Sequence, residues 1–201
     1  MMSARTSATQ TGRTTVLSVA RRVLPALGKP LLFAALMWLA AAAGEIAIPG
    51  TPVPITLQTF VVMLAALMLD WCQAAGAVVL YLSAGAAGLP VFAGGASTAA
   101  LFGPSAGFLI GFLPGVIVTA LLRGNARLDS PIHAAITAVR FFGAALIGSV
   151  AVVYLFGFAI QSLLTHTPIT VVAIASMGFV AGDIIKAAVA ALATTALAKL
   201  R

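Results

Sequence analysis

Charged residues are scarce in this chain of 201 residues. Only 7% are Asp, Glu, Lys or Arg, whereas 62% are hydrophobic. A soluble globular domain carries about 25% charged residues, because its surface faces water. The sequence therefore excludes an ordinary soluble enzyme and predicts an integral membrane protein, with lipid around most of its surface.

Cysteines and enzyme motifs are also lacking. The single cysteine, Cys72, excludes an internal disulfide framework and a Cys-based zinc site. The sequence contains no His-Glu-x-x-His, Gly-x-Ser-x-Gly or Walker A motif. We therefore expect no enzyme, no catalytic residues, no metal, no cofactor and no ATP binding of the Walker type in this chain.

The apolar residues fall into six segments, which predict an all-α bundle of six transmembrane helices. The second is shorter than the ~20 residues that a span needs, so it either tilts or lies partly within the bundle. The predicted segments are Leu31–Ile48, Thr56–Leu69, Ala74–Leu89, Gly103–Leu122, Val139–Leu164 and Val171–Leu200.

The basic residues predict the orientation of these segments. The net charge is +7, but the Lys and Arg side chains flank apolar runs, which argues against nucleic-acid binding. Five of them lie in residues 1–29. Of the others, Arg123 and Arg127 follow the fourth segment, Arg140 opens the fifth, and Lys199 and Arg201 close the chain, so that only Lys186 lies outside this pattern. We predict that both termini are cytoplasmic, with a basic tail over 1–29 and a transmembrane domain over 30–201.

The loops on the predicted outer side are unusually apolar. Residues 49–54 and 88–98 combine Pro and Gly with hydrophobic residues. Irregular apolar backbone is tolerated near a membrane where it packs on protein or lines a cavity. These loops are either lids over an outward-facing pocket or tight turns at the interface.

Small residues form two helical stripes. Gly103, Gly107, Gly111 and Gly115 recur every four residues and predict close helix packing. The spacing of Ala40 and Gly44 predicts a small face in the first segment, which packs inside the bundle or against another membrane protein.

Two opposite charges mark the last segment. Asp183 and Lys186 are three residues apart, so they share a helix face, deep in an apolar run. A charge near the middle of a bilayer costs ~2.5–3.5 kcal/mol on insertion scales. The pair is either a structural ion pair or part of a polar ligand pocket. Gln58 and Tyr81 are further intramembrane polar candidates, and Phe92 is a candidate apolar wall.

Four motifs in order resemble the BioY family, the biotin-binding S components of energy-coupling factor (ECF) transporters. The resemblance covers about residues 30–200. The motifs are Val53-Pro54-Ile55-Thr56-Leu57-Gln58-Thr59-Phe60, Tyr81-Leu82 followed by Gly88-Leu89-Pro90-Val91-Phe92-Ala93-Gly94-Gly95, then Phe102-Gly103-Pro104-Ser105-Ala106-Gly107-Phe108, and Gly182-Asp183-Ile184-Ile185-Lys186.

The resemblance implies a six-helix protein of the bacterial cytoplasmic membrane that takes up biotin. It also implies partners, namely a transmembrane coupling subunit and ATPase subunits. Asp183 and Lys186 match family positions around the ureido ring, and Gln58 belongs to the matching first-loop motif. Ala96 stands where some members have Asn, and Leu109 where some carry a charge.

The chemistry of biotin suits these residues. Asp183 can accept from a ureido N–H, Lys186 can donate to its carbonyl, and the loops with Tyr81 and Phe92 offer an apolar wall. Gly94, Gly95, Ser97 and Thr98 are candidates for the ligand carboxylate. Two alternatives stay open, namely an S component for another vitamin and a stand-alone secondary transporter of a small carboxylate in which Asp183 relays protons.

Overall fold

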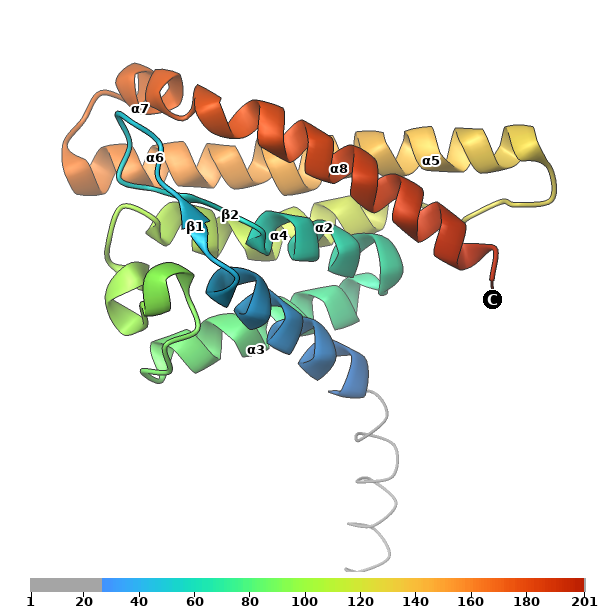
Figure 1. Cartoon of the computed structure of the whole chain (residues 1–201), viewed down its shortest axis with the longest axis horizontal. Helices are drawn as coiled ribbons and strands as arrows, with labels where there is room; N and C mark the ends of the chain where they lie inside the picture. The colour runs from blue at the N-terminus through green and yellow to red at the C-terminus, as the bar shows by residue number, and fades with distance from the viewer. Residues whose placement is uncertain (1–26, 201) are drawn as a thin grey trace, which may run out of the picture.

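The computed structural model describes residues 27–200, most of which are helical (Figure 1). The predicted all-α class is therefore confirmed. Of the basic tail predicted over 1–29, residues 1–26 lie outside the described part. In chain order the elements are a first helix over Leu27–Ala42, β1 (Glu45–Ile46), β2 (Ile55–Thr56), α2 (Gln58–Met68), α3 (Trp71–Ala86), η1 (Ala93–Gly95), η2 (Thr98–Leu101), α4 (Ala106–Leu122), α5 (Pro131–Ala145), η3 (Leu146–Val152), α6 (Val153–Thr165), α7 (Ile169–Ala175) and α8 (Met177–Ala198).

The first helix ends earlier than predicted. It stops at Ala42, and Gly44 has a φ of +118°, a conformation that L side chains rarely adopt. The chain then forms β1, which pairs antiparallel with β2, so that Glu45 lies opposite Thr56. This two-residue ladder turns the apolar loop over 47–54 back toward the start of α2.

The fifth segment is longer than predicted at its N-terminal side. Its helix begins at Pro131, where the hydroxyl of Ser130 accepts a hydrogen bond from the backbone N–H of His133 at 3.3 Å. It continues through the π-helix η3 to Thr165. Pro131–Thr165 and Met177–Ala198 are the described helices that are long and apolar enough to cross a membrane by themselves, and the shorter apolar helices have 11–17 residues.

The sixth segment is broken, whereas a single helix was predicted over 171–200. The short α7 ends at Ala175, and α8 begins at Met177 after the single residue Ser176. The loop over 47–54 packs at this break, because a Cβ on Gly178 would lie 3.0 Å from Cδ1 of Ile48. The break leaves Asp183 in the second turn of α8, near the same loop.

The glycine stripe of α4 packs closely on the fifth segment, as predicted. A Cβ on Gly111 would lie 3.1 Å from the Cα of Val153, and a Cβ on Gly115 would lie 3.0 Å from the carbonyl oxygen of Gly148. Gly103 precedes α4 and is not part of this contact. α4 therefore serves as the central helix, and it touches α2, α3, α5 and α6.

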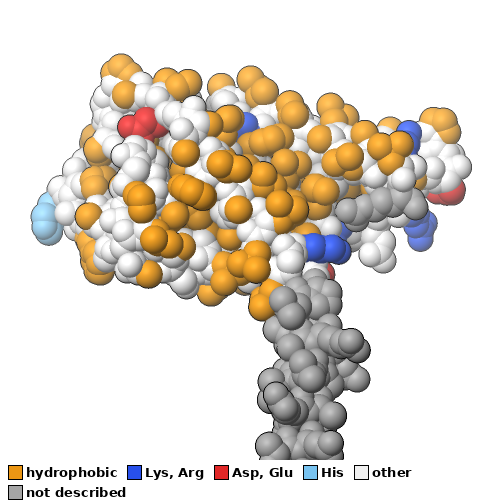
Figure 2. Space-filling model, turned by 60° about the horizontal axis from the view of Figure 1, so that its bottom comes forward, with side chains coloured by type: hydrophobic (Ala, Val, Ile, Leu, Met, Phe, Trp, Pro, Cys, Tyr) orange, Lys and Arg blue, Asp and Glu red, His pale blue; other side chains and the backbone are white. Residues whose placement is uncertain are grey.

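The irregular segments gather at one end of the bundle. Figure 1 shows the hairpin loop, η1, η2 and α7 at the left, whereas α8 ends at the right, where α5 begins. The ends of α2, α4 and α8 meet at the right, where Leu67, Arg123 and Leu197 line one cavity. The surface between the two ends is largely apolar (Figure 2), which fits a membrane protein.

Candidate functional site

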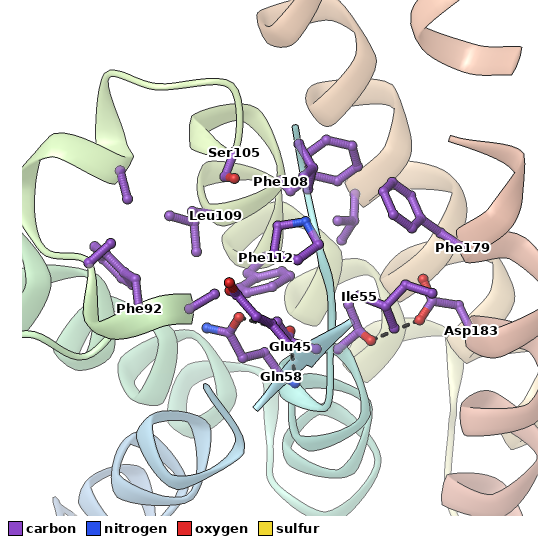
Figure 3. A pocket seen from close by; sticks show the side chains of 18 of the residues that line it. Glu45, Ile55, Gln58, Phe92, Ser105, Phe108, Leu109, Phe112, Phe179 and Asp183 are labelled. Atoms are coloured by element: carbon purple, nitrogen blue, oxygen red, sulfur yellow. Dashed lines mark hydrogen bonds between the residues drawn. The ribbon is translucent and has the colours of Figure 1, made fainter. Parts of the chain in front are cut away.

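A cavity of about 260 Å³ opens among the irregular segments (Figure 3). It is bounded by the hairpin, the loop over 92–105, and parts of α2, α4, α6 and α8. Most of its wall is apolar, with a few polar side chains, as in small-molecule sites. Its lining residues are Glu45, Pro52, Val53, Pro54, Ile55, Thr56, Gln58, Thr59, Phe92, Ala93, Ala96, Ala100, Ser105, Phe108, Leu109, Phe112, Val153, Tyr154, Phe179, Asp183 and Lys186.

The carboxylate of Asp183 is buried in this wall, with 4% of the residue exposed. Its Oδ1 accepts from the hydroxyl of Thr59 at 2.8 Å and from Nζ of Lys186 at 2.9 Å, and its Oδ2 accepts from the hydroxyl of Tyr154 at 2.7 Å. A carboxylate offers about four lone-pair sites. Three donors from the protein therefore leave one acceptor position for a ligand.

Lys186, in contrast, has no free hydrogen-bond donor for a ligand. Its ammonium donates to Asp183, to the backbone oxygen of Thr56 at 2.8 Å and to the hydroxyl of Thr59 at 2.9 Å. An ammonium has three N–H donors, so all are engaged. Lys186 therefore neutralises the carboxylate and ties α8 to the start of α2, and it reaches a ligand only by giving up one of these bonds.

A π-helix sets the direction of Tyr154. η3 ends at Val152, immediately before the two lining residues Val153 and Tyr154. In a π-helix each backbone hydrogen bond spans five residues instead of four, so the side chains that follow it are rotated about the helix axis. A buried hydrogen bond of 2.9 Å between the hydroxyls of Thr119 and Ser149 fastens η3 to α4. The register that aims Tyr154 at the cavity is thus fixed by packing.

Gln58 and Tyr81 form a second buried polar group. Gln58 lines the cavity, is 4% exposed, and donates from Nε2 to the hydroxyl of Tyr81. Tyr81 in turn donates to the backbone oxygen of Val91 at 2.9 Å. Tyr81 does not line the cavity. It instead connects α3 to the loop before η1 and holds the amide of Gln58 in place.

The predicted loop residues divide into lining and supporting positions. Phe92 lines the cavity, and its ring meets that of Tyr81 edge to face at 5.3 Å. Gly94, Gly95 and Ser97 are not among the lining residues, although their neighbours Ala93 and Ala96 are. Gly94 and Gly95 have φ values of +64° and +75°, so they shape the turn that brings these alanines to the wall. The hydroxyl of Thr98 donates to the backbone oxygens of Gly85 and Ala86.

The aromatic wall and two polar groups of the cavity were not predicted from the sequence. Phe108, Tyr154 and Phe179 surround one side of the cavity with ring centroids 6.0–6.5 Å apart. The four-residue spacing of Phe108 and Phe112 signals a shared helix face, but no sequence feature marks Tyr154. Thr59 bridges the ion pair. Glu45 is exposed and yet lines the cavity.

Comparisons with known proteins point to one family. The sequence pattern of the BioY family matches residues 14–201. The chain is 38% identical to a biotin transporter BioY of Rhizobium etli over 80% of this chain and 86% of that protein. It is 35% identical to the Thermotoga maritima biotin transporter BioY over 77% and 86%, respectively. A crystal structure of the S-component for biotin from an ECF-type ABC transporter matches with a TM-score of 0.79 and 25% identity, over 89% of this chain and 93% of that one.

Proposed function

The chain belongs to the BioY family, and we propose that it takes up biotin as the substrate-binding S component of an ECF transporter. The homologues are named as transporters, not as enzymes. The observation that carries the proposal is the buried Asp183–Lys186 pair, which faces a largely apolar cavity instead of lipid or solid packing.

The ureido ring of biotin is proposed to bind at Asp183. The ring has N–H donors, and the open acceptor position of the carboxylate takes one of them. A hydrogen bond from the ligand to the carboxylate of this ion pair is stronger than one to a neutral group. The aromatic rings of Phe108, Tyr154 and Phe179 supply the apolar surface for the bicyclic body.

The remaining site residues are proposed to act from the opposite side of the cavity. Gln58 offers its amide, and Phe92 packs on the ligand. Tyr81 positions both of them through its hydrogen bonds to Gln58 and to the loop. Gly94, Gly95 and Ser97 belong to the loop that covers this end, where they determine how it folds over the ligand.

We propose six transmembrane helices with both termini in the cytoplasm of a bacterium and the cavity facing outward. Arg123 and Arg127 lie where α4 ends and α5 begins, opposite the hairpin and its loops, and the guanidinium of Arg140 donates to the backbone oxygen of Asn125 in the same loop. In Figure 2 the Lys and Arg side chains also gather mainly toward that end. Cytoplasmic loops carry the excess of basic residues, which supports a multi-pass protein of the cytoplasmic membrane. In this proposal residues 1–29 are a cytoplasmic tail and 30–201 the transmembrane domain.

The coupling subunit and its ATPases are proposed to engage the first helix. The small face predicted around Ala40 is not available for this contact, because Ala40 is 7% exposed and packs in the core, while Gly44 lies beyond the helix. The outward side of the helix carries Ala35, Trp38, Leu39 and Ala42. Its two alanines are the positions at which another membrane helix can approach closely.

Binding of labelled biotin to the purified chain in detergent tests the proposal. Saturable binding that excess biotin displaces, and that other vitamins do not, supports it. Displacement by another vitamin instead of biotin would assign a different substrate. Uptake in cells that collapses with an uncoupler but survives deletion of the ATPase subunits would contradict the ECF role and favour a proton-driven carrier.

A further inference from the structure

The charges around the cavity carry an inference about the tail of the ligand, which rests on the proposed function. Among the described residues that line the cavity, Glu45 and Asp183 carry carboxylates, and Lys186 is the one Lys or Arg. Asp183 and Lys186 form an ion pair of 2.9 Å. Because the pair neutralises itself, Glu45 is the unbalanced charge of the lining.

Glu45 sits where the ligand tail has to pass. In Figure 3 its side chain points into the cavity on the side of Gln58 and Phe92, while Asp183 lies on the opposite side. A ureido ring bound at Asp183 therefore directs its side chain toward Glu45. The wall around this region includes Ala96, Leu109 and Phe92, which offer no positive charge.

The backbone of the glycine loop is already next to a carboxylate. A Cβ built on Gly94 would lie 3.4 Å from Oε2 and 3.5 Å from Oε1 of Glu45. From the sequence, this loop was a candidate binding site for the ligand carboxylate. In the structure a ligand carboxylate at Gly94 would meet that of Glu45, and like charges at such a distance repel.

We propose that Glu45 is a specificity-determining residue that disfavours a free carboxylate on the ligand tail and favours an amide-capped or cationic one. The chain thus accepts biotin joined through an amide bond at least as well as free biotin. Glu45 is exposed, so water screens the repulsion and the effect is moderate. We expect about three- to tenfold weaker binding of the carboxylate than of the neutral amide.

The test compares three probes on the full-length chain in detergent, namely biotin, biotinamide and the aminoethyl amide of biotin, each competing with labelled biotin. The expected order of affinity is aminoethyl amide, then biotinamide, then biotin. The differences should shrink in about 1 M salt, because screening acts on charge and not on shape. This comparison uses the wild-type chain alone, so its result does not depend on whether a variant folds.

Variants of Glu45 complete the test. Glu45→Gln should strengthen biotin binding about three- to tenfold and leave biotinamide unchanged, whereas Glu45→Asp should retain the preference. If biotin binds most tightly in the wild type, or if Glu45→Gln preserves the order of the probes, this inference is wrong although the proposed function stands. If none of the three probes binds, the proposed function fails and the inference with it.

Discussion

Replacing Asp183 by Asn tests the buried ion pair with the smallest change in shape. The substitution exchanges one carboxylate oxygen for an NH2 group and removes the negative charge. Thr59, Tyr154 and Lys186 all donate to this carboxylate. An asparagine can accept from some of them, but its amide nitrogen then faces a donor, and Lys186 loses its counter-charge.

The expected loss of biotin affinity is about 10- to 100-fold. A hydrogen bond to a charged group contributes about 1.5–3 kcal/mol, and each 1.4 kcal/mol corresponds to a factor of ten in Kd. The free energy of unfolding should also fall. Removing one partner of a buried pair costs about 3–5 kcal/mol, and we expect the lower end, because Lys186 keeps its bonds to Thr56 and Thr59.

Equilibrium binding of labelled biotin to detergent-solubilised protein measures this effect, and thermal unfolding shows whether the variant is folded. Asp129→Asn is the matched control. Asp129 bonds to His133 at 2.9 Å in an exposed loop outside the cavity. Its substitution should leave the Kd unchanged. A folded Asp183→Asn variant whose Kd stays within about twofold of the wild type would refute the assignment of Asp183 to the ligand site.

Three further predictions concern the wall, the packing and the partner surface. Tyr154→Phe keeps the ring but removes the hydroxyl that donates to the buried carboxylate, so the Kd of biotin should rise about three- to tenfold in the same assay; an unchanged Kd would exclude a contribution of this hydrogen bond to biotin binding. Gly148→Ala places a Cβ 2.7 Å from the backbone oxygen of Gly115 and should destabilise the fold by about 1–3 kcal/mol in thermal unfolding, whereas Gly143→Ala, with nothing within 4 Å, should not. Ala35→Trp should stop biotin uptake in cells and leave binding to the purified chain intact; parallel loss of both would argue against a partner surface on the first helix.

The ion pair was predictable because its signal is local. Two opposite charges three residues apart in an apolar helix share a face whatever the rest of the chain does. A charged side chain within the membrane needs a partner, so these two side chains had to contact each other or a ligand. The glycine stripe was predictable for the same reason, since spacing by four defines a line along any helix.

The positions of Tyr154 and Glu45 were not predictable, because each depends on a local break in regular structure. Tyr154 follows a π-helix, which shifts the helical register by one residue, about a quarter of a turn. Glu45 would lie on the first helix if that helix ran to residue 48. The positive φ of Gly44 ends the helix and turns Glu45 into a strand beside the cavity.

The loop residues show a third kind of limit. Phe92 lines the cavity and Gly94 does not, although they are two residues apart in one apolar motif. Their roles follow from the turn made by two consecutive residues with positive φ and from the ring of Phe92 packing on Gly85. The composition of the loop predicts that it covers a cavity, whereas the geometry of the turn determines which of its side chains face that cavity.

The most direct test of the account is the stoichiometry and affinity of biotin for the purified chain without any partner protein. Isothermal titration in detergent should give one site per chain with a Kd below about 1 μM, which corresponds to a binding free energy of about −8 kcal/mol or better. A heat signal that does not saturate with added biotin would contradict the claim that the cavity is a biotin site. So would a Kd that is the same for the wild type and for Asp183→Asn.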